Sequence, residues 1–369
     1  MSKGGSLMDK EILIIRLSSV GDVMHCTPVA GSLKAAWPEC KITWLVGEVC
    51  ADLIKYNPNV DESIVWSRER FEKHLRACEF REALTMWRSL KEVLAARSFY
   101  AVLDIHGLFL TGMIARLART CRRIGMSNAR ELNPLFMTET AKPAGQHIID
   151  RYLSVLEPLG ITPTQRKMTL VVPAEAQQFA GDFLRNKGVF PNERVAVLVP
   201  GTTWPAKNWP PEFFAATAKL LAKDFKIVLC GGRAEADLGR ETQARAGVPV
   251  VNAIGRTGLL ELAGIIEQAS VVVAGDTGPL HMAAALGVPT VAIFGPTNPA
   301  TYAPPGKQNS VLVNRFSCSF CHKYRCPTGK AECMSSVLPE QVVEQVYNVA
   351  RQKYLKTYCL VHNLPGRGK

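Results

Sequence analysis

The stretch VVVAGDTGPLHMAAALGVPTVAIFGPTNP, residues 271–299, indicates the fold more clearly than any other part of the chain. Its Val- and Ala-rich start predicts a buried strand at 271–274, and a helix at 280–286 and a second strand at 290–294 follow. The turn at 275–279 contains Gly, Asp and Thr. Such a turn places free backbone N–H groups and a helix N-terminus where a phosphate can bind. The stretch therefore predicts an α/β fold with a nucleotide-linked ligand.

Strand-like and helix-like segments alternate through the rest of the chain, which is typical of a mostly parallel, doubly wound sheet. In the first half, strands are expected at 11–17, 41–46, 63–66, 100–105 and 123–126, with helices at 21–37, 68–97 and 107–117. The pattern restarts near residue 192, with strands at 194–199, 226–230 and 250–252 and helices at 211–223, 235–246 and 259–268. The unit at 271–294 is expected to complete the second sheet.

This alternation predicts two similar α/β domains that face each other across a cleft. We expect an N-terminal domain at 1–180, with a short flexible start at 1–6, and a C-terminal domain at 190–338. A last helix and a basic tail occupy 339–369. Loops after strands are the expected binding loops, because ligands of such sheets bind at the carboxyl ends of strands.

Composition narrows the classes of protein. No apolar run is long enough to span a bilayer, and residues 12–17 are too few for the apolar core of a signal peptide, so we expect a cytoplasmic protein. The net charge is +12, of which +7 (10 basic and 3 acidic groups) falls in residues 307–369. This charge favours an anionic lipid, a phosphorylated substrate or a nucleic acid as partner, unless it serves solubility alone. Because the paired aromatics of nucleic-acid binders are missing, we expect no nucleic-acid partner.

The eleven cysteines are scattered and mostly in apolar contexts, which fits a reducing compartment better than a disulfide framework. Four of them form a dense cluster, Cys318, Cys321, Cys326 and Cys333. Four thiolates at this density can bind a structural zinc ion, although the spacing is not a common two-knuckle pattern. Packed or redox-labile thiols are the equally open alternative, and we expect no catalytic metal.

Three further loops follow predicted strands. In SSVGDVMH, residues 18–25, Asp22 is either a helix N-cap, which its position alone favours, or a general base. In the loop at 200–210, the hydroxyls of Thr202 and Thr203 and the ammonium of Lys207 suit phosphate oxygens, while the two Trp residues of this loop equally suit packing. In the loop at 230–235, Glu235 can accept hydrogen bonds from ribose hydroxyls, although a Gly-Gly pair alone is more often a tight turn.

Together, SSVGDVMH, TTWPAKNWP and the 275–299 motif resemble the ADP-heptose:lipopolysaccharide heptosyltransferases of glycosyltransferase family 9, over roughly residues 11–350. The resemblance implies a GT-B architecture of two Rossmann-like domains, with the C-terminal helix packing back towards the first. It also implies an inverting enzyme that needs no metal or cofactor. Such an enzyme moves L-glycero-D-manno-heptose from ADP-heptose to the inner core of lipopolysaccharide, on Kdo-lipid A or a heptosyl acceptor.

By position, the resemblance makes Asp22 the catalytic base and Glu235 the ribose-binding carboxylate. Thr202, Thr203 and Lys207 resemble the residues that hold the diphosphate. Asp276, Thr277 and Gly278 resemble residues around the sugar and phosphates, with His281 on the helix behind them. The lipid A–core acceptor implies peripheral contact with the cytoplasmic surface of the inner membrane.

Some readings stay open. His106 stands where the family usually has Gln, so it either contacts the acceptor or is a satisfied polar residue. The enzyme class also has rivals: a nucleotide-sugar 2-epimerase of GT-B shape, or a family member that uses another nucleotide sugar. A non-catalytic nucleotide-sugar binding protein is a further alternative.

Overall fold

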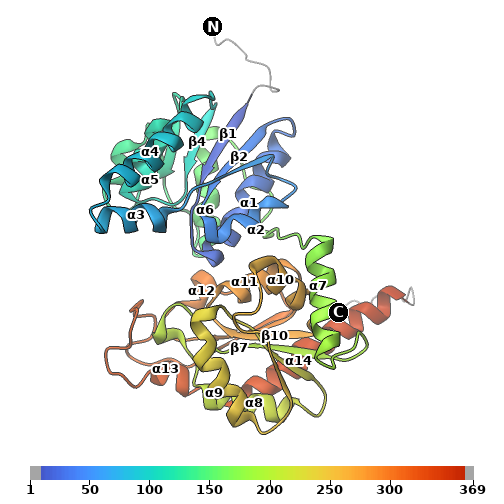
Figure 1. The fold of residues 1–369 in the computed structure, drawn as a ribbon. Coiled ribbons are helices and arrows are strands. Elements are labelled where there is room, and N and C mark those ends of the chain that lie inside the picture. Colours follow the sequence, from blue (N-terminus) through green and yellow to red (C-terminus); the bar gives the residue numbers. More distant parts are fainter. Residues whose placement is uncertain (1–9, 362–369) are drawn as a thin grey trace. The chain divides into compact units, whose positions relative to one another are not determined.

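The structure is a computed structural model that describes residues 10–361, with side chains as far as Arg351. The chain forms two compact units, Met1–Val171 and Val172–Lys369, each with its own parallel sheet (Figure 1). The expected flexible start at residues 1–6 and the last part of the basic tail, after residue 361, lie outside the described residues.

The first unit is a parallel sheet of six strands in the order β3-β2-β1-β4-β5-β6. Its strands are β1 (Glu11–Ile15), β2 (Lys41–Val46), β3 (Glu62–Val65), β4 (Ala101–Asp104), β5 (Arg123–Met126) and β6 (Glu139–Ala141). Its α-helices are α1 (Val20–Ala36), α2 (Ala51–Lys55), α3 (Arg68–Arg76), α4 (Phe80–Ala95), α5 (Phe109–Leu117) and α6 (Ile148–Leu153). Ile12, Leu13 and Ile14 of β1 are fully buried, because helices cover both faces of a parallel sheet.

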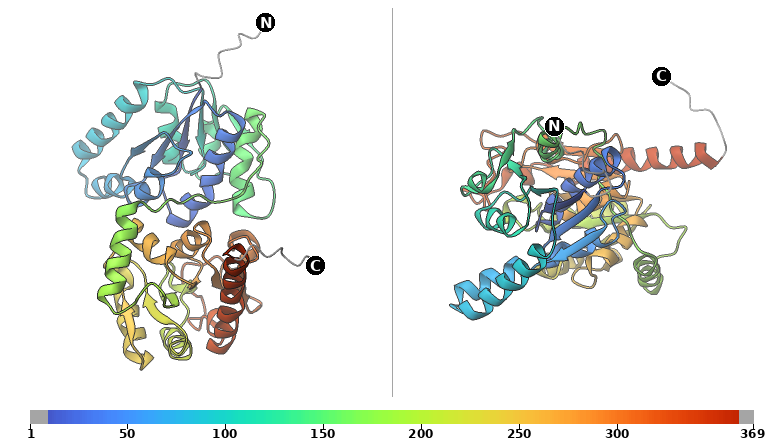
Figure 2. Two further views of the ribbon diagram at one scale, coloured as in Figure 1. Left: turned by 90° about the vertical axis from the view of Figure 1, so that its right-hand side faces the viewer. Right: turned by 90° about the horizontal axis from the view of Figure 1, so that it is seen from above.

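The structure departs from the sequence expectations at several places in this unit, and the short helices α2 and α6 were not expected. The single helix expected at 68–97 is two helices, α3 and α4, separated at Cys78, whose φ of 58° is left-handed. Seen from above in Figure 2, the two helices extend away from the sheet. The edge strand β6 was not expected, because it has only three residues.

The second unit repeats the strand order of the first. Its sheet runs β12-β11-β10-β7-β8-β9, and all neighbours are parallel. The strands are β7 (Val195–Val199), β8 (Lys226–Leu229), β9 (Val250–Asn252), β10 (Val271–Gly275), β11 (Thr290–Phe294) and β12 (Asn309–Val313). The α-helices are α7 (Ala174–Asn186), α8 (Pro211–Leu221), α9 (Ala236–Ala246), α10 (Leu259–Glu267), α11 (Gly278–Ala285), α12 (Pro299–Tyr302), α13 (Glu332–Ser335) and α14 (Pro339–Val361).

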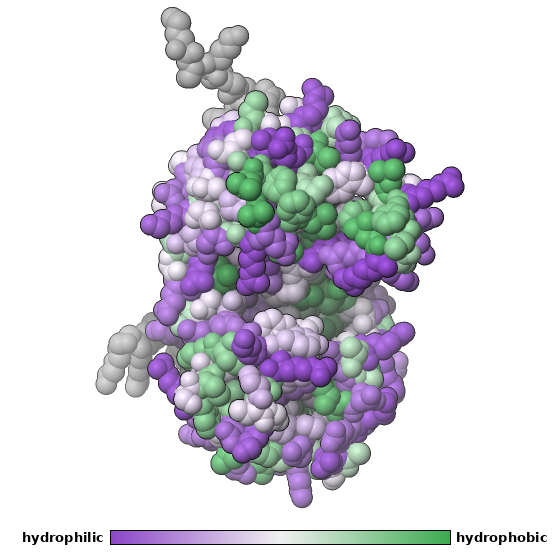
Figure 3. Space-filling model, turned by 90° about the vertical axis from the view of Figure 1, so that its left-hand side faces the viewer, coloured by the Kyte–Doolittle hydropathy of each residue, from purple (hydrophilic) through white to green (hydrophobic). Residues whose placement is uncertain are grey.

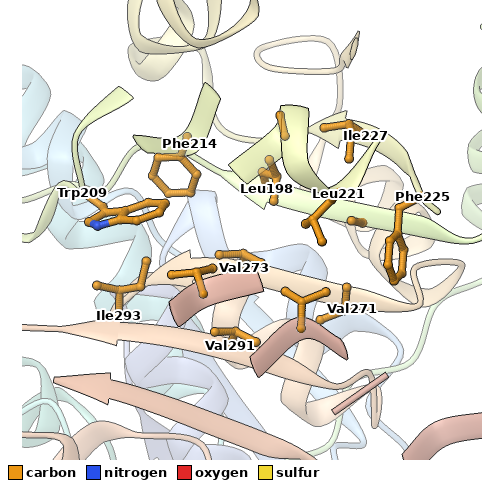
Figure 4. Packing of buried hydrophobic residues seen from close by; sticks show 14 of the residues in the cluster. Leu198, Trp209, Phe214, Leu221, Phe225, Ile227, Val271, Val273, Val291 and Ile293 are labelled. Carbon is orange, nitrogen blue, oxygen red and sulfur yellow. The ribbon is translucent and has the colours of Figure 1, made fainter. Parts of the chain in front are cut away.

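The core of the second unit lies between this sheet and the helices α8 and α14. Trp209 and Phe214 pack with Val273 and Ile293 of the central strands (Figure 4). Trp209 is fully buried, and its indole N–H donates to the carbonyl of Val337 at 2.9 Å. Trp209 is therefore a packing residue, one of the two alternatives left open for the aromatics of its loop.

Two expectations about the second unit change, and a third is left open. The 271–294 stretch does not complete the sheet, because β12 pairs beyond β11. The unit begins at Val172, earlier than expected, because α7 packs against α10, as the left view of Figure 2 shows. The helix α14 packs against α8 and against β10, β11 and β12 of its own unit. Its expected approach to the first unit stays a prediction.

The contact between α7 and α10 depends on Gly264. A Cβ at this position would lie 2.6 Å from the carbonyl oxygen of Ala176 and 3.0 Å from the Cβ of Ala180. We expect Gly264→Ala to lower the free energy of unfolding by about 1–3 kcal/mol, because the backbone of α7 has to move. Gly181→Ala is the matched control on α7, where the nearest side-chain atom is 3.9 Å away, and it should leave stability equal or slightly higher. Urea denaturation measures both changes, and equal midpoints for the two variants would contradict this account.

No helix within residues 10–361 is both long enough and apolar enough to cross a membrane.

Candidate functional site

Both sheets reverse their strand order at the same place. In the first unit the reversal falls between β1 and β4, and in the second between β7 and β10. In doubly wound sheets, ligands bind beyond the carboxyl ends of the strands at this switch point. Three of the loops singled out in the sequence follow β1, β7 and β10, so the topology places them at the two switch points. The fourth, at 230–235, follows β8, the neighbour of β7.

In the first unit, Asp22 lies in the first turn of α1, which begins at Val20. The N-cap residue of this helix is Ser19, whose side chain makes no capping hydrogen bond. The reading of Asp22 as an N-cap is therefore wrong, and its carboxylate is engaged with side chains instead.

Three side chains hold the carboxylate of Asp22. Arg16 Nη2 lies 2.8 Å from Oδ2, which also accepts from Ser19 Oγ at 2.9 Å. The hydroxyl of Tyr152, on α6, donates to Oδ1 at 2.9 Å. Arg16 is buried, donates to the carbonyl of Ile105 and stacks over the ring of Tyr152. The Asp22 side chain keeps 31% of its surface exposed, so a ligand can reach it.

These contacts keep Asp22 ionised. Burial alone would raise the pKa of this carboxyl group, but the charges of Arg16 and His25 and the two hydroxyl donors outweigh it. The pKa of Asp22 is held well below its ordinary value. Asp22 is therefore a charged hydrogen-bond acceptor at any physiological pH, with a modest intrinsic basicity.

His106 lies in the loop after β4, the neighbour of β1. Burial and the positive charges of Arg16 and Arg68 lower the pKa of His106 to about 3, so its ring is neutral. Arg68 Nη1 lies 3.2 Å from Nε2, and because arginine has only donors, Nε2 accepts and the proton sits on Nδ1. Nδ1 has no hydrogen-bond partner among the residues that the structure describes. Of the two ring nitrogens of His106, only Nε2 is therefore satisfied within the protein.

In the second unit, Asp276 is the centre of a compact network beyond β10. Its Oδ2 is 2.7 Å from Lys207 Nζ and accepts from Thr297 Oγ1 at 2.8 Å. Its Oδ1 is 3.3 Å from Nε2 of the buried His281. The register explains the meeting of Lys207 and Asp276, because β7 and β10 are adjacent strands whose loops leave the sheet side by side.

The network keeps Asp276 ionised as well. Burial would raise the pKa of Asp276, but the hydrogen bond with His281 and the charge of Lys207 bring it well below its ordinary value. The ammonium of Lys207 has three donors, and only one is directed at Asp276. Lys207 Nζ also lies 4.5 Å from the centre of the Trp204 ring, so an aromatic face and a carboxylate fix its position together.

The two threonines of the same loop differ. Thr202 Oγ1 lies 2.8 Å from the carbonyl of Trp204 and 2.9 Å from Oδ1 of Asn208, so its proton is used within the loop. Thr203 is exposed. Of the two predicted phosphate-binding hydroxyls, Thr203 is thus the one that a ligand can reach without breaking the loop.

The remaining predicted residues of the second unit lie at the same edge of the sheet. Glu235, in the turn after β8, packs on the β7 loop so closely that a Cβ at Gly201 would come 2.1 Å from its Cγ. Gly278 is the first residue of α11, with Thr277 as its N-cap residue. The N-terminus of α11, Lys207 and Glu235 therefore belong to neighbouring loops of one sheet edge.

The four clustered cysteines have free thiols, and Cys333 lies against Gly295, at the end of β11. Within the described residues, no group of three or more His, Cys, Asp or Glu side chains could hold a metal ion. The structural zinc ion and the alternative of packed or redox-labile thiols both stay predictions.

Sequence reasoning missed Arg16, Tyr152 and Thr297. Tyr152 is 130 positions from Asp22, so only the fold brings them together. Arg16 and Thr297 were within reach of prediction, because Arg16 lies at the end of the strand predicted at 11–17, just before the loop at 18–25, and Thr297 lies within the 275–299 motif.

Comparison with known proteins agrees with this fold. The sequence model of glycosyltransferase family 9 (heptosyltransferase) matches residues 87–332. Lipopolysaccharide heptosyltransferase 1 of Pseudomonas aeruginosa is 27% identical, over 91% of this chain and 96% of that protein.

Two solved structures extend the likeness to three dimensions. The family 9 glycosyl transferase of Veillonella parvula has a TM-score of 0.83 and 26% identity, over 93% of this chain and 98% of that one. The E. coli heptosyltransferase WaaC with ADP-2-deoxy-2-fluoro heptose has a TM-score of 0.68 and 27% identity, over 92% and 99%. The chain is thus a glycosyltransferase of GT-B fold that belongs to glycosyltransferase family 9, the heptosyltransferase family.

Proposed function

We propose that this enzyme transfers L-glycero-D-manno-heptose from ADP-heptose to the inner core of lipopolysaccharide, with Kdo-lipid A or a heptosyl sugar as acceptor. The observation that carries the proposal is the Lys207–Asp276 pair at the switch point of the second sheet. A cation fixed beside a helix N-terminus at this position suits a sugar diphosphate. The likeness to an enzyme solved with an ADP-heptose analogue supports ADP-heptose as the donor.

In this proposal, the second unit binds the donor. Lys207 directs its two remaining donors at the diphosphate, together with the Thr203 hydroxyl and the backbone N–H groups at the start of α11. Glu235 accepts hydrogen bonds from the ribose. Asp276 can only accept hydrogen bonds, and unprotonated phosphates donate none, so it orients Lys207 and accepts from sugar hydroxyls. Thr297 and His281 hold Asp276 in that orientation.

Asp22 of the first unit is the proposed general base. As the acceptor hydroxyl oxygen forms its bond to the anomeric carbon, its proton passes to the Asp22 carboxylate. The bond between that carbon and the phosphate oxygen breaks, and ADP leaves with the electron pair. Attack from the face opposite the phosphate inverts the anomeric configuration. Because Arg16 depresses the pKa of Asp22, the proton moves late, when the hydroxyl has become acidic through bond formation.

We propose further that no metal or cofactor takes part and that the enzyme works at the cytoplasmic surface of the inner membrane, where a lipid-linked acceptor is available. Lys207 and the helix N-terminus supply the positive field that a diphosphate leaving group needs.

A panel of nucleotide sugars offered with truncated lipid A–core acceptors tests the function. The expected result is heptose transfer from ADP-heptose, with inversion detected by NMR of the product. Transfer from a different nucleotide sugar would support the proposed mechanism but show that ADP-heptose is not the donor. Product formed from the donor alone would favour the epimerase alternative, and binding without any turnover would favour a non-catalytic protein.

The pH dependence of transfer follows from the depressed pKa values. Asp22 and Asp276 have pKa values lowered from 3.8, and His106 is neutral above about pH 3. All three therefore keep one protonation state down to about pH 4, and the contribution of the two ionised carboxylates to stability is lost only below that. We expect kcat/KM to stay flat between pH 5.5 and 8. A steep acid limb near pH 6 that disappears in His106→Gln would show that His106 titrates during catalysis.

A further inference from the structure

A short turn after β5 presents two leucines to solvent. Leu132 and Leu135 keep 67% and 76% of their surface exposed, the largest values among the big apolar side chains of the described residues. Glu131 and Leu132 both adopt left-handed backbone conformations, with φ of 54° and 60°. Such a conformation costs about 1 kcal/mol for a residue with a side chain, so the turn is held in place by its surroundings.

The anchor of the turn is the fully buried Asn133. Its side-chain amide donates to Asp104 Oδ2 at 2.7 Å and to the carbonyl of Leu108 at 2.8 Å. The ring of Phe136 packs on the ring of Phe109 at 5.1 Å. A Cβ at Gly112 would come 2.6 Å from Phe136, so the turn fits tightly on α5. The exposure of the two leucines is thus a property of an ordered surface.

The same surface continues along α5. Phe109 and Met113 are one helical turn apart and keep 45% and 36% of their surface exposed. We call the four side chains Phe109, Met113, Leu132 and Leu135 the apolar ridge. Helices α3, α4 and α5 lie on the left of Figure 1, the side that faces the viewer in Figure 3, where hydrophobic patches gather on the first unit among hydrophilic ones.

Basic side chains flank the apolar ridge. Arg116 lies one helical turn beyond Met113, and Arg130 directly precedes the turn. Both are exposed, and neither forms an ion pair with a residue that the structure describes. The carboxylate of Glu131 accepts from the backbone N–H of Phe109. Apolar side chains bordered by unpaired arginines are complementary to a surface with anionic head groups over an acyl interior.

The apolar ridge is linked to the switch point of its own unit. Asp104, which holds Asn133 through Oδ2, accepts through Oδ1 from the backbone N–H groups of His106 and Gly107. One buried carboxylate therefore positions both the turn and the His106 loop. If this turn contacts a bilayer, the His106 loop beside Asp22 is therefore held at a fixed position relative to that bilayer.

We propose that the apolar ridge docks this enzyme on an anionic phospholipid bilayer, with Leu132 and Leu135 entering the interfacial layer. The inference deepens the proposed function, on which it rests for a lipid-anchored acceptor. Docking holds the first unit against the membrane that carries the acceptor, so the acceptor sugar is presented to the His106 loop from a defined side.

Co-sedimentation of the full chain with vesicles of phosphatidylethanolamine and phosphatidylglycerol (3:1) tests the proposal. We expect the wild-type protein to bind these vesicles, to bind pure phosphatidylcholine much more weakly, and to lose binding as salt rises. The double variant Leu132→Asn with Leu135→Ser should bind at least about ten-fold more weakly, since it removes two apolar anchors. Asn tolerates the left-handed backbone at 132, so the fold is retained.

Phe190→Ser is the matched control, because Phe190 is a comparably exposed apolar residue (58%) in the second unit. It should bind vesicles like the wild type. Arg116→Gln with Arg130→Gln should weaken binding to the anionic vesicles alone. Equal vesicle binding by the wild type and the leucine variant would overturn the proposal. So would a vesicle-free dimer, detected by analytical ultracentrifugation, that the leucine variant abolishes, since the apolar ridge would then be covered by a second copy.

Transfer assays separate this inference from the proposed function. The leucine variant should keep wild-type turnover on a water-soluble, acyl-free core acceptor and lose turnover on the same core embedded in vesicles. A wild type that transfers no sugar to either acceptor but still binds vesicles through the apolar ridge would disprove the proposed function and support the docking surface.

Discussion

Replacing Asp22 by Asn is expected to lower kcat for sugar transfer by about 10²–10⁴-fold, the usual contribution of a general base. The amide oxygen of Asn can take the place of Oδ1 and accept from Tyr152, while its NH2 group takes the place of Oδ2, which Ser19 and Arg16 contact. The size of the side chain and one hydrogen bond are thus kept while the proton acceptor is lost. The affinity for ADP should stay within about two-fold of the wild type, because every proposed donor-binding group lies in the second unit. Single-turnover kinetics and calorimetric titration with ADP measure the two quantities.

Tyr152→Phe is the control for Asp22→Asn. It removes one hydrogen bond to the carboxylate without removing the charge, so its effect on kcat should stay below about ten-fold. Since Asp22→Asn leaves the buried Arg16 without its counter-ion, a melting curve of each variant is needed beside the kinetics. Normal turnover by a folded Asp22→Asn enzyme would remove Asp22 from the mechanism.

Lys207→Ala should weaken ADP binding by roughly ten- to hundred-fold, which corresponds to the loss of about 1.5–3 kcal/mol for hydrogen bonds to a charged group. Two effects act together in this variant. The diphosphate loses its cation, and the ionised Asp276 is left beside it as an uncompensated negative charge. Turnover should fall as well, because the leaving ADP is no longer stabilised.

The double variant Lys207→Ala with Asp276→Asn distinguishes these effects. If repulsion by Asp276 contributes, the double variant should bind ADP more tightly than Lys207→Ala alone. Lys226→Ala is the matched control. Lys226 is the first residue of β8, so it lies at the amino ends of the strands, away from the Lys207 loop, and it pairs with Glu193. Unchanged ADP affinity in Lys207→Ala would contradict the diphosphate role.

The order of strands and helices could largely be predicted, because buried parallel strands such as Val195–Val199 and Val271–Gly275 are continuous apolar runs. The edge strands β6 and β12 were not predicted, since β6 has only three residues and β12 is only half-buried along its whole length. The break between α3 and α4 falls at Ala77-Cys78-Glu79, a sequence without the Gly or Pro that usually ends a helix.

Some residues of the candidate sites could be predicted from the sequence and others could not. Lys207, Glu235 and Asp276 were predictable because each follows a strand, and strand neighbours share an edge. The hydroxyl of Tyr152, which helps to keep Asp22 ionised, was not, because its contact with Asp22 depends on how α6 packs on α1. A sequence shows which group has the chemistry, whereas its protonation state depends on distant neighbours.

The single passage of the chain from one unit to the other, at Val171 and Val172, has an evolutionary consequence. Each half carries a complete sheet, so recombination at that junction exchanges whole modules and leaves both interiors intact. Under the proposed function, in which the second unit binds the donor, such an exchange changes the pairing of sugar donor and acceptor without the gradual remodelling of either half.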